Sequence, residues 1–225
     1  MGSRIHLPDV TLVSATSIDI QDTLLAFAIS MHDIDFGAIK FLTPEEVPNL
    51  DPRIERVSIP SINLLGYSKL IFNELYQFID TPYCLVIQAD GFVLNARSWR
   101  TEFLDYDYIG APWDRYLRVG DNFIDTENSR VGNGGFSLRS KKLLELTAKI
   151  PFDNLSFPSK SEDLIIGYYL RNDMIKGGIK FPTPELAAKF SIESPDSAYG
   201  QTPSTAFGFH GKSLRDLVFS SIKNT

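Results

Sequence analysis

A run of apolar residues that ends in Asp90 and Gly91 constrains the fold of this chain more than any other feature. Five of the six residues at 83–88 are apolar, the pattern of a strand covered on both faces, as in a parallel sheet between helices. Such sheets bind ligands beyond the carboxyl ends of their strands, where Asp90 is expected. Gly91 would let the backbone turn or a ligand come close. The run suggests a metal or phosphate site, with a plain Asp-Gly turn as the alternative.

The rest of the first half predicts alternating strands and helices, with Ser17 or Asp19 as the cap of the first helix. Strands are expected over residues 10–17, 38–42 and 57–59, and helices over 20–31 and 68–79. The alternation predicts an α/β fold: one domain, 1–225, with a mainly parallel twisted sheet flanked by helices.

The second half is less regular. The polar stretch 116–130 is expected to be a surface loop, the usual place for a lid. The other expected elements are helices over 97–104, 140–149 and 162–171, and short strands over 108–111 and 136–138.

Charge and composition limit the partners. The net charge of −6 argues against duplex nucleic acid, which would be expected to require a basic face. No apolar stretch is long enough to span a membrane, and the N-terminus lacks the pattern of a signal peptide, so a cytoplasmic location is expected, with peripheral contact at a membrane left open. The one cysteine, Cys84, lies inside the apolar run and is expected to be a buried hydrophobe. The oligomeric state stays open.

Three glycines surround Asn133 in the segment 132–135. Glycine permits close approach of backbone N–H groups to a ligand, or simply a tight turn. The spacing matches neither a dinucleotide-binding motif nor a P-loop.

An acidic pair, Glu162 and Asp163, follows Ser161 at an expected helix start. The pair could simply complement the helix dipole, with Ser161 as the cap. Adjacent residues point about 100° apart around a helix, so one carboxylate could fix the local structure while the other faces a cleft as a base.

A histidine near the C-terminus, His210, stands between Phe209 and Gly211. It is either a satisfied structural histidine or a metal ligand. Asp90 and His210 together would suit a divalent ion that also takes phosphate oxygens. Glu193 could pair with Arg139 or a substrate hydroxyl, or remain a solvated charge, and Trp113 belongs to an aromatic-rich segment that could stack on a sugar or pack in the core.

Taken in order, six segments resemble a family of small GT-A-type glycosyltransferases and glycosyltransferase-like domains from bacteria and large viruses. They are QADG at 88–91, DYDYIGAPW at 105–113, VGNGGFSLRS at 131–140, ED at 162–163, AAKFSIE at 187–193 and FGFHG at 207–211. The resemblance implies a GT-A-like domain with a Rossmann-like nucleotide-binding half at about 10–95 and an acceptor half at about 96–215.

The resemblance also implies the site. GT-A enzymes hold Mn²⁺ or Mg²⁺ with an Asp-X-Asp motif, of which Gln88 replaces the first acid here and Asp90 remains, with His210 as a further ligand. Asp163, beside Glu162, matches the catalytic base of inverting enzymes. The residues expected to contact the nucleotide-sugar are Val13, Ser14, Thr16, Tyr67, Lys69, Gln88, Ala89, Asp90, Trp113, Asn133, Gly134 and Gly135, the two glycines by leaving room for the sugar and Trp113 and Asn133 by orienting its hydroxyls.

The expected function is therefore metal-assisted, inverting transfer from a UDP-sugar to a glycan, lipid-linked or protein-linked acceptor, in polysaccharide or glycoconjugate synthesis. Two alternatives stay open. One is a metal-dependent phosphohydrolase or nucleotidyltransferase, which could use the same Asp and His. The other is a glycan-binding domain with a decayed site.

Overall fold

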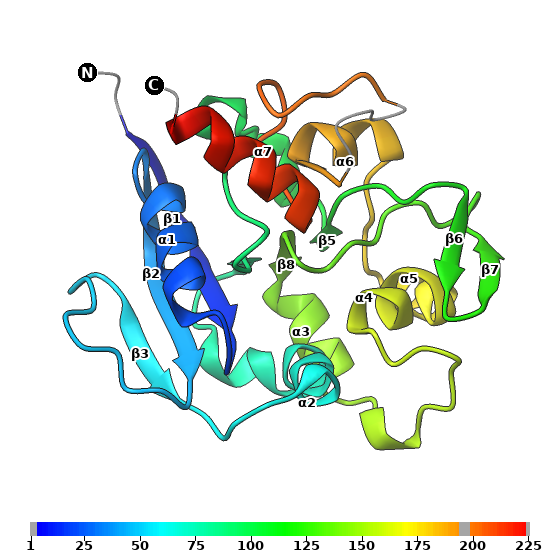
Figure 1. Cartoon of the computed structure of the whole chain (residues 1–225). Helices are drawn as coiled ribbons and strands as arrows, with labels where there is room; N and C mark the ends of the chain where they lie inside the picture. Colours follow the sequence, from blue (N-terminus) through cyan, green and yellow to red (C-terminus); the bar gives the residue numbers. More distant parts are fainter. Residues whose placement is uncertain (1–3, 194–198, 224–225) are drawn as a thin grey trace.

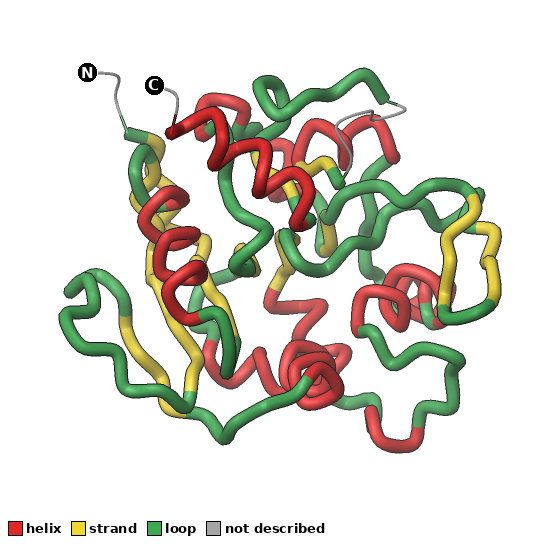
Figure 2. Tube along the Cα trace, viewed as in Figure 1, coloured by secondary structure: helices red, strands yellow, loops and turns green. Residues whose placement is uncertain are grey.

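The structure, a computed structural model, describes residues 4–193 and 199–223. Its centre is a six-stranded sheet in the order β3-β2-β1-β4-β8-β5 (Figures 1 and 2). The strands are β1 (Ile5–Ala15), β2 (Ile34–Thr43), β3 (Glu55–Ser58), β4 (Tyr83–Val86), β5 (Tyr108–Ile109) and β8 (Ser137–Ser140). The strands β1 to β4 are parallel to one another. The strand β8 runs antiparallel to both of its neighbours, β4 and β5. The predicted α/β fold with a mainly parallel sheet is confirmed.

The strand β1 shows why the sheet is covered on both faces. Leu12 packs in one core cluster with Phe27 of α1 (Ile20–Ser30), while its neighbour Val13 packs in a second cluster with Leu70 and Leu144. Alternate residues of a strand point to opposite faces. The second face is covered by α3 (Lys141–Thr147) and by α2 (Leu64–Lys69), whose helix continues through a π-helical turn (Leu70–Glu74) and a 3₁₀ turn (Leu75–Phe78).

Cys84, Leu85 and Val86 of β4 are fully buried and Tyr83 is partly exposed, and the strand ends at Val86 and not at Asp90. The next residues close a tight turn, in which the Gln88 N–H donates to the Gly91 carbonyl (2.8 Å) and the Gly91 N–H donates back to Gln88 (3.1 Å). This turn holds Asp90 just beyond the sheet. The predicted Asp-Gly turn is confirmed, and the role of Asp90 as a ligand residue stays a prediction.

The two predicted helix caps are wrong. Asp19 precedes α1 in a left-handed conformation (φ 52°) and its side chain makes no capping bond, while the Ser17 hydroxyl accepts a bond from the Ile62 N–H instead. Ser161 makes no side-chain cap either, and its hydroxyl bonds with that of Ser159. In both places the serine hydroxyl that could cap the helix bonds to a different group.

The stretch 116–130 contains a hairpin rather than an irregular loop. Its strands are β6 (Tyr116–Val119) and β7 (Asn122–Asp125), with Gly120 at a positive φ in the turn. Its inner side chains Leu117 and Ile124 pack on Trp113. The hairpin projects from the edge of the molecule beside α4 and α5 (Figure 1).

The remaining elements complete the second half. The helix predicted at 162–171 is divided into α4 (Glu162–Leu164) and a π-helical turn (Ile165–Tyr169), followed by α5 (Arg171–Lys176). The helix predicted at 97–104 is two short 3₁₀ turns (Ala96–Ser98 and Thr101–Asp105). The sequence reasoning missed α6 (Pro184–Phe190), the paired strands β9 (Ser191–Ile192) and β10 (Gly208–Phe209), α7 (Lys212–Lys223) and a 3₁₀ turn (Phe152–Asn154).

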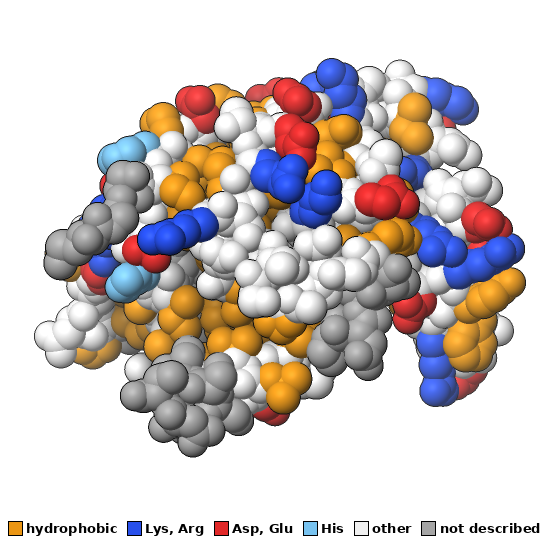
Figure 3. All heavy atoms as spheres, turned by 90° about the horizontal axis from the view of Figure 1, so that it is seen from above, with side chains coloured by type: hydrophobic (Ala, Val, Ile, Leu, Met, Phe, Trp, Pro, Cys, Tyr) orange, Lys and Arg blue, Asp and Glu red, His pale blue; other side chains and the backbone are white. Residues whose placement is uncertain are grey.

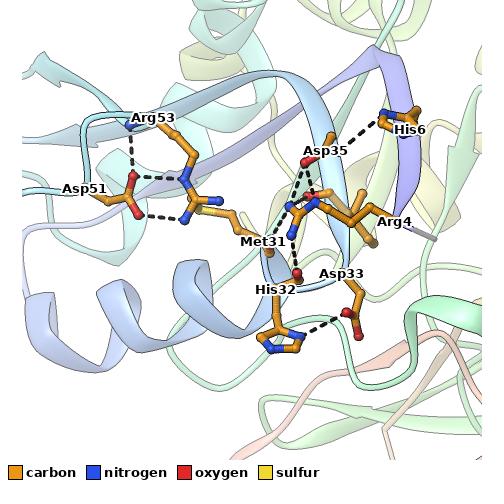
Figure 4. A network of polar contacts seen from close by, with 9 residues as sticks. Arg4, His6, Met31, His32, Asp33, Asp35, Asp51 and Arg53 are labelled. Atoms are coloured by element: carbon orange, nitrogen blue, oxygen red, sulfur yellow. Dashed lines mark hydrogen bonds and ion pairs between the residues drawn. The ribbon is translucent and has the colours of Figure 1, made fainter. Parts of the chain in front are cut away.

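Arg4 fastens the start of β1 to the turn between α1 and β2 (Figure 4). Its guanidinium pairs with Asp35 and donates to the carbonyls of Met31, His32 and Ile34. One side chain thus bonds to three carbonyls in the segment that joins the end of α1 to the start of β2. Among the described residues, no helix has the length and apolar character needed to cross a membrane.

Candidate active site

A cavity of about 420 Å³ lies beyond the carboxyl ends of β1 and β4. The β1–α1 loop and the start of α2 line it on either side. Six of the residues predicted to contact a nucleotide line it: Ser14, Thr16, Tyr67, Gln88, Ala89 and Asp90. A volume of this size is typical of small-molecule sites.

Three predicted contact residues lie elsewhere. Val13 is buried in the core beneath the cavity, because the alternation along β1 turns its side chain into the sheet's covered face. Lys69 lies at the surface and pairs with Asp153 at 2.5 Å. Trp113 is only 4% exposed and packs with Val119 and Leu164, so it is a core residue and does not face this cavity.

Asp90 and His210 come together at the edge of the cavity. His210 Nε2 lies 3.7 Å from Asp90 Oδ1 and 3.2 Å from Gln88 Oε1. Neighbouring ligands in an octahedral shell with bonds of about 2.1 Å are separated by about 3 Å. These three donors therefore fit around a Mn²⁺ or Mg²⁺ ion after a small adjustment, with the amide of Gln88 in the place of the missing first acid.

Glu193 supports His210 from the other side. Its Oε1 lies 3.6 Å from His210 Nδ1 and accepts a 2.5 Å hydrogen bond from Asn133 Nδ2. A carboxylate on one ring nitrogen favours the tautomer that leaves the other free for a metal. Burial alone would lower the pKa of His210, but Glu193 and Asp90 more than offset it and raise the pKa above its usual value. Asn133, predicted to orient a sugar hydroxyl, holds Glu193 in this structure.

The glycines at 134–135 admit the site's own side chains. A Cβ at Gly135 would collide with His210 Nε2 and lie 2.8 Å from Gln88 Oε1. A Cβ at Gly134 would collide with Glu162 Oε1 and lie 2.9 Å from Arg139 Nη2. The space predicted for a donor sugar at these Cβ positions is thus filled by protein, and the loop lies between the Asp90–His210 pair and the acidic pair.

Asp163 accepts two backbone hydrogen bonds, from Leu164 N–H at 2.7 Å and from Gly134 N–H at 3.2 Å. Burial and the neighbouring Glu162 raise the pKa of Asp163 to about 6, although both N–H groups and Arg139 act in the opposite direction. A carboxylate with such a pKa is suited to take a proton near neutral pH.

Glu162 plays the structural part that the sequence reasoning assigned to one member of the pair. It forms a 2.9 Å ion pair with Arg139, whose side chain is fully buried and whose Nε donates to Ser137 Oγ. The Ser137 hydroxyl in turn donates to the Gly134 carbonyl at 2.8 Å. Of the alternatives left open for Glu193, a pair with Arg139 does not form, since Arg139 pairs with Glu162 and Glu193 lies beside His210.

Sequence reasoning missed the role of Arg139 and the position of the Tyr67 hydroxyl. Both Arg139 Nη1 and the Tyr67 hydroxyl are buried and lack a protein hydrogen-bond partner among the described residues. Orphaned polar atoms of this kind are few in folded proteins, and in this structure Tyr169, Arg171 and Ser191 also carry one. The available signal for Arg139 was its position directly after the strand predicted at 136–138, where a charged residue follows a mostly apolar segment.

The described residues contain no group of three or more His, Cys, Asp and Glu side chains arranged to hold a metal. A metal at this site would be coordinated by Asp90, His210 and the side-chain oxygen of Gln88, and by oxygens of a bound phosphate-containing ligand.

Residues 53–210 match the sequence family described as "Protein of unknown function (DUF5672)". This chain belongs to that family. No curated protein matches the chain.

Among solved structures, the chain is similar to the mannosyltransferase PcManGT from Pyrobaculum calidifontis in complex with GDP-Man and Mn²⁺, with 10% identity and a TM-score of 0.47 over 79% of this chain. It spans 57% of that protein's chain. It is also similar to the galactosyltransferase LgtC in complex with donor and acceptor sugar analogs, with 13% identity and a TM-score of 0.44 over 89% of this chain and 86% of the other. These likenesses concern the fold.

Proposed function

We propose that this family member is a glycosyltransferase that moves a sugar from a nucleotide-diphosphate donor, a UDP-sugar, to an acceptor hydroxyl with inversion at the anomeric carbon. The observation that supports it best is that the proposed base, Asp163, and the proposed metal ligand, His210, both contact the glycine loop 132–135. Asp163 bonds to Gly134, and His210 packs on the next residue, Gly135. Asp163 is near enough to His210 to help raise its pKa. A proton acceptor and a diphosphate-binding pair thus share one site.

The donor would lie with its nucleoside in the cavity beside Ser14, Thr16 and Tyr67, and with its diphosphate at the turn that carries Asp90. Asp90, His210 and the Gln88 amide would hold a divalent ion, Mn²⁺ or Mg²⁺. When bound, such an ion supplies Lewis-acid stabilisation of the leaving diphosphate.

Asp163 would act on the acceptor. One of its oxygens takes the hydroxyl proton while the acceptor oxygen bonds to the anomeric carbon and the bond from that carbon to the diphosphate breaks. The Gly134 and Leu164 N–H groups hold the carboxylate in place during this transfer. Attack on the face opposite the leaving group gives the inverted anomer.

A transfer assay over a panel of nucleotide-sugars and sugar acceptors tests this proposal. Asp163→Asn should lower the transfer rate about 10²-fold or more, because an amide cannot accept the proton. Asp153→Asn, a matched change at a surface ion pair, should leave the rate near that of wild type.

Near-normal transfer by Asp163→Asn contradicts the role of the base, and a product with the retained anomer contradicts inversion. Release of inorganic phosphate without sugar transfer would favour the phosphohydrolase alternative. Glycan binding that needs neither nucleotide nor metal would favour the binding-domain alternative.

A further inference from the structure

A second cavity, also of about 420 Å³, shares no lining residue with the nucleotide cavity. Its lining is Arg97, Ser98, Trp99, Arg100, Lys189, Gln201 and Thr205. The elements that carry these residues, the segment before β5, α6 and the loop before β10, lie at the top of the molecule in Figure 1. Figure 3 shows that side from above, with Lys and Arg side chains interspersed with Asp and Glu side chains over the face.

The charge of this cavity opposes that of the whole chain. The chain carries a net charge of −6, yet among the described residues three cationic side chains and no carboxylate line the cavity. Arg100 pairs with Glu102 at 3.2 Å, with both side chains about half exposed. Within residues 4–193 and 199–223, neither Arg97 nor Lys189 has an ion pair. Like charges around one concavity repel one another, and a bound anion would relieve that repulsion.

The walls of the cavity are fixed by hydrogen bonds between distant segments. The Ser98 hydroxyl donates to the Thr205 carbonyl at 2.9 Å, and the Asn95 amide donates both to Ser98 Oγ (2.8 Å) and to the Ser204 carbonyl (3.0 Å). These bonds hold the Arg97 segment against the loop before β10, so the concavity exists without a ligand.

The floor of the cavity is anchored in the core. Trp99 makes edge contacts with Phe103 and Phe207, whose ring centroids lie 5.5 and 5.1 Å away. Its ring cannot shift without disturbing the phenylalanine core, so it anchors the backbone segment that carries the neighbouring arginines. A site with such a preformed frame loses less entropy on binding than loose surface side chains would.

We propose that this cavity binds a small molecule that carries a phosphate group, independently of the nucleotide cavity. Two guanidinium groups and an ammonium match phosphate oxygens by charge and by hydrogen-bond geometry. The volume exceeds what a lone phosphate needs and lies in the range of small-molecule sites, so the rest of the ligand, such as a sugar ring, fits beside Trp99 and Gln201. The proposal does not depend on glycosyl transfer.

The two tryptophans of the chain make a direct test possible, because Trp99 lines the cavity and Trp113 is buried elsewhere. In a ¹⁵N-labelled sample with EDTA and constant ionic strength, glucose 6-phosphate should shift the indole N–H signal of Trp99 in a saturable way. The signal is assigned from Trp99→Phe. Glucose alone and acetate, at equal concentration, should not shift the Trp99 signal. A parallel titration with inorganic phosphate separates binding of the bare anion from binding of the sugar phosphate.

Arg97→Gln combined with Lys189→Gln should weaken the binding of glucose 6-phosphate about tenfold or more, because two charged contacts are lost. Lys176→Gln removes one positive charge from an exposed side chain outside the cavity and should not change the binding. Asp90→Ala should not change it either, which separates this proposal from that of the nucleotide site. An unsaturable shift, an equal shift with acetate, or unchanged binding in the double variant would overturn the proposal.

Discussion

Chemistry and stability oppose each other at Asp163. Its pKa is raised from 3.8 to about 6 by burial and by Glu162. The folded state therefore binds the proton more tightly than the unfolded state, and stability falls as the pH rises between these two values. The proposed base, ionised at neutral pH, is thus held at a cost in folding free energy.

An Asp163→Asn variant tests this cost, because its amide stays neutral at every pH. The free energy of unfolding of the variant, relative to wild type, should rise by about 1–3 kcal/mol between pH 4 and pH 8. Thermal unfolding of both proteins at pH 4, 6 and 8 measures the change. A difference that is the same at all three pH values contradicts a raised pKa at this residue.

Gly135 is the residue on which the position of His210 depends most directly. In Gly135→Ala the added methyl group would occupy the place of His210 Nε2. The imidazole must turn away from Asp90, so Mn²⁺ affinity should fall about tenfold or more, as on loss of a ligand or its support. The loss of free Mn²⁺ signal in an electron paramagnetic resonance titration reports the affinity.

Gly120→Asn provides a matched glycine control for that titration. Gly120 lies in the hairpin turn at φ 60°, with open space around it, and asparagine tolerates this conformation. Mn²⁺ affinity should be unchanged in the control. If Gly135→Ala also binds Mn²⁺ as wild type does, His210 is not a ligand in the proposed position.

At the level of secondary-structure elements, Asn73 joins the helix that follows α2 to the end of α3. Its amide donates to the carbonyls of Thr147 (2.9 Å) and Ile150 (2.8 Å), and its side-chain oxygen accepts from the Phe152 N–H (3.3 Å). Asn73→Ala leaves these backbone groups unpaired and should lower the free energy of unfolding by about 2–3 kcal/mol. Urea unfolding measures this effect.

Asn154→Ala is the control for Asn73, since Asn154 is exposed in the adjacent 3₁₀ turn. It should change the stability by less than about 0.5 kcal/mol. A similarly small effect of Asn73→Ala would mean that the three hydrogen bonds do not hold the two helices together.

The long elements were predictable from sequence because their patterns are local. The four-residue strand β4 lies in a continuous apolar run, and the eleven-residue helix α1 is long enough for its apolar residues to recur at helical spacing. The two-residue strands β5, β9 and β10 are too short for any period, and the hairpin 116–125 alternates weakly because Tyr116 and Phe123 are exposed on its outer face. The predicted helix starts at residues 20 and 162 are confirmed, but the predicted caps are wrong, because the hydroxyls of Ser17 and Ser161 bond to groups outside those helices.

For the whole molecule, the position of Asp90 beyond the sheet could be predicted from its strand, while Ser14 and Tyr67 were expected from the family resemblance alone. Ser14 and Asp90 meet at one cavity because the parallel strands β1 and β4 end at the same sheet edge, and α2 brings Tyr67 there. The pairings Glu193–His210 and Arg139–Glu162 could not be predicted, since they depend on how distant segments pack. For the same reason Val13, Lys69 and Trp113 were assigned to a ligand that their side chains do not face.

The most direct test of the proposed function is calorimetric binding of UDP, GDP and their common sugar conjugates, with and without Mn²⁺, to wild type and Asp90→Ala. The account predicts that Mn²⁺ strengthens the binding of one nucleotide, a uridine one, and that Asp90→Ala abolishes this strengthening because the ion loses a ligand. No binding of any nucleotide in the presence or absence of Mn²⁺ would contradict it.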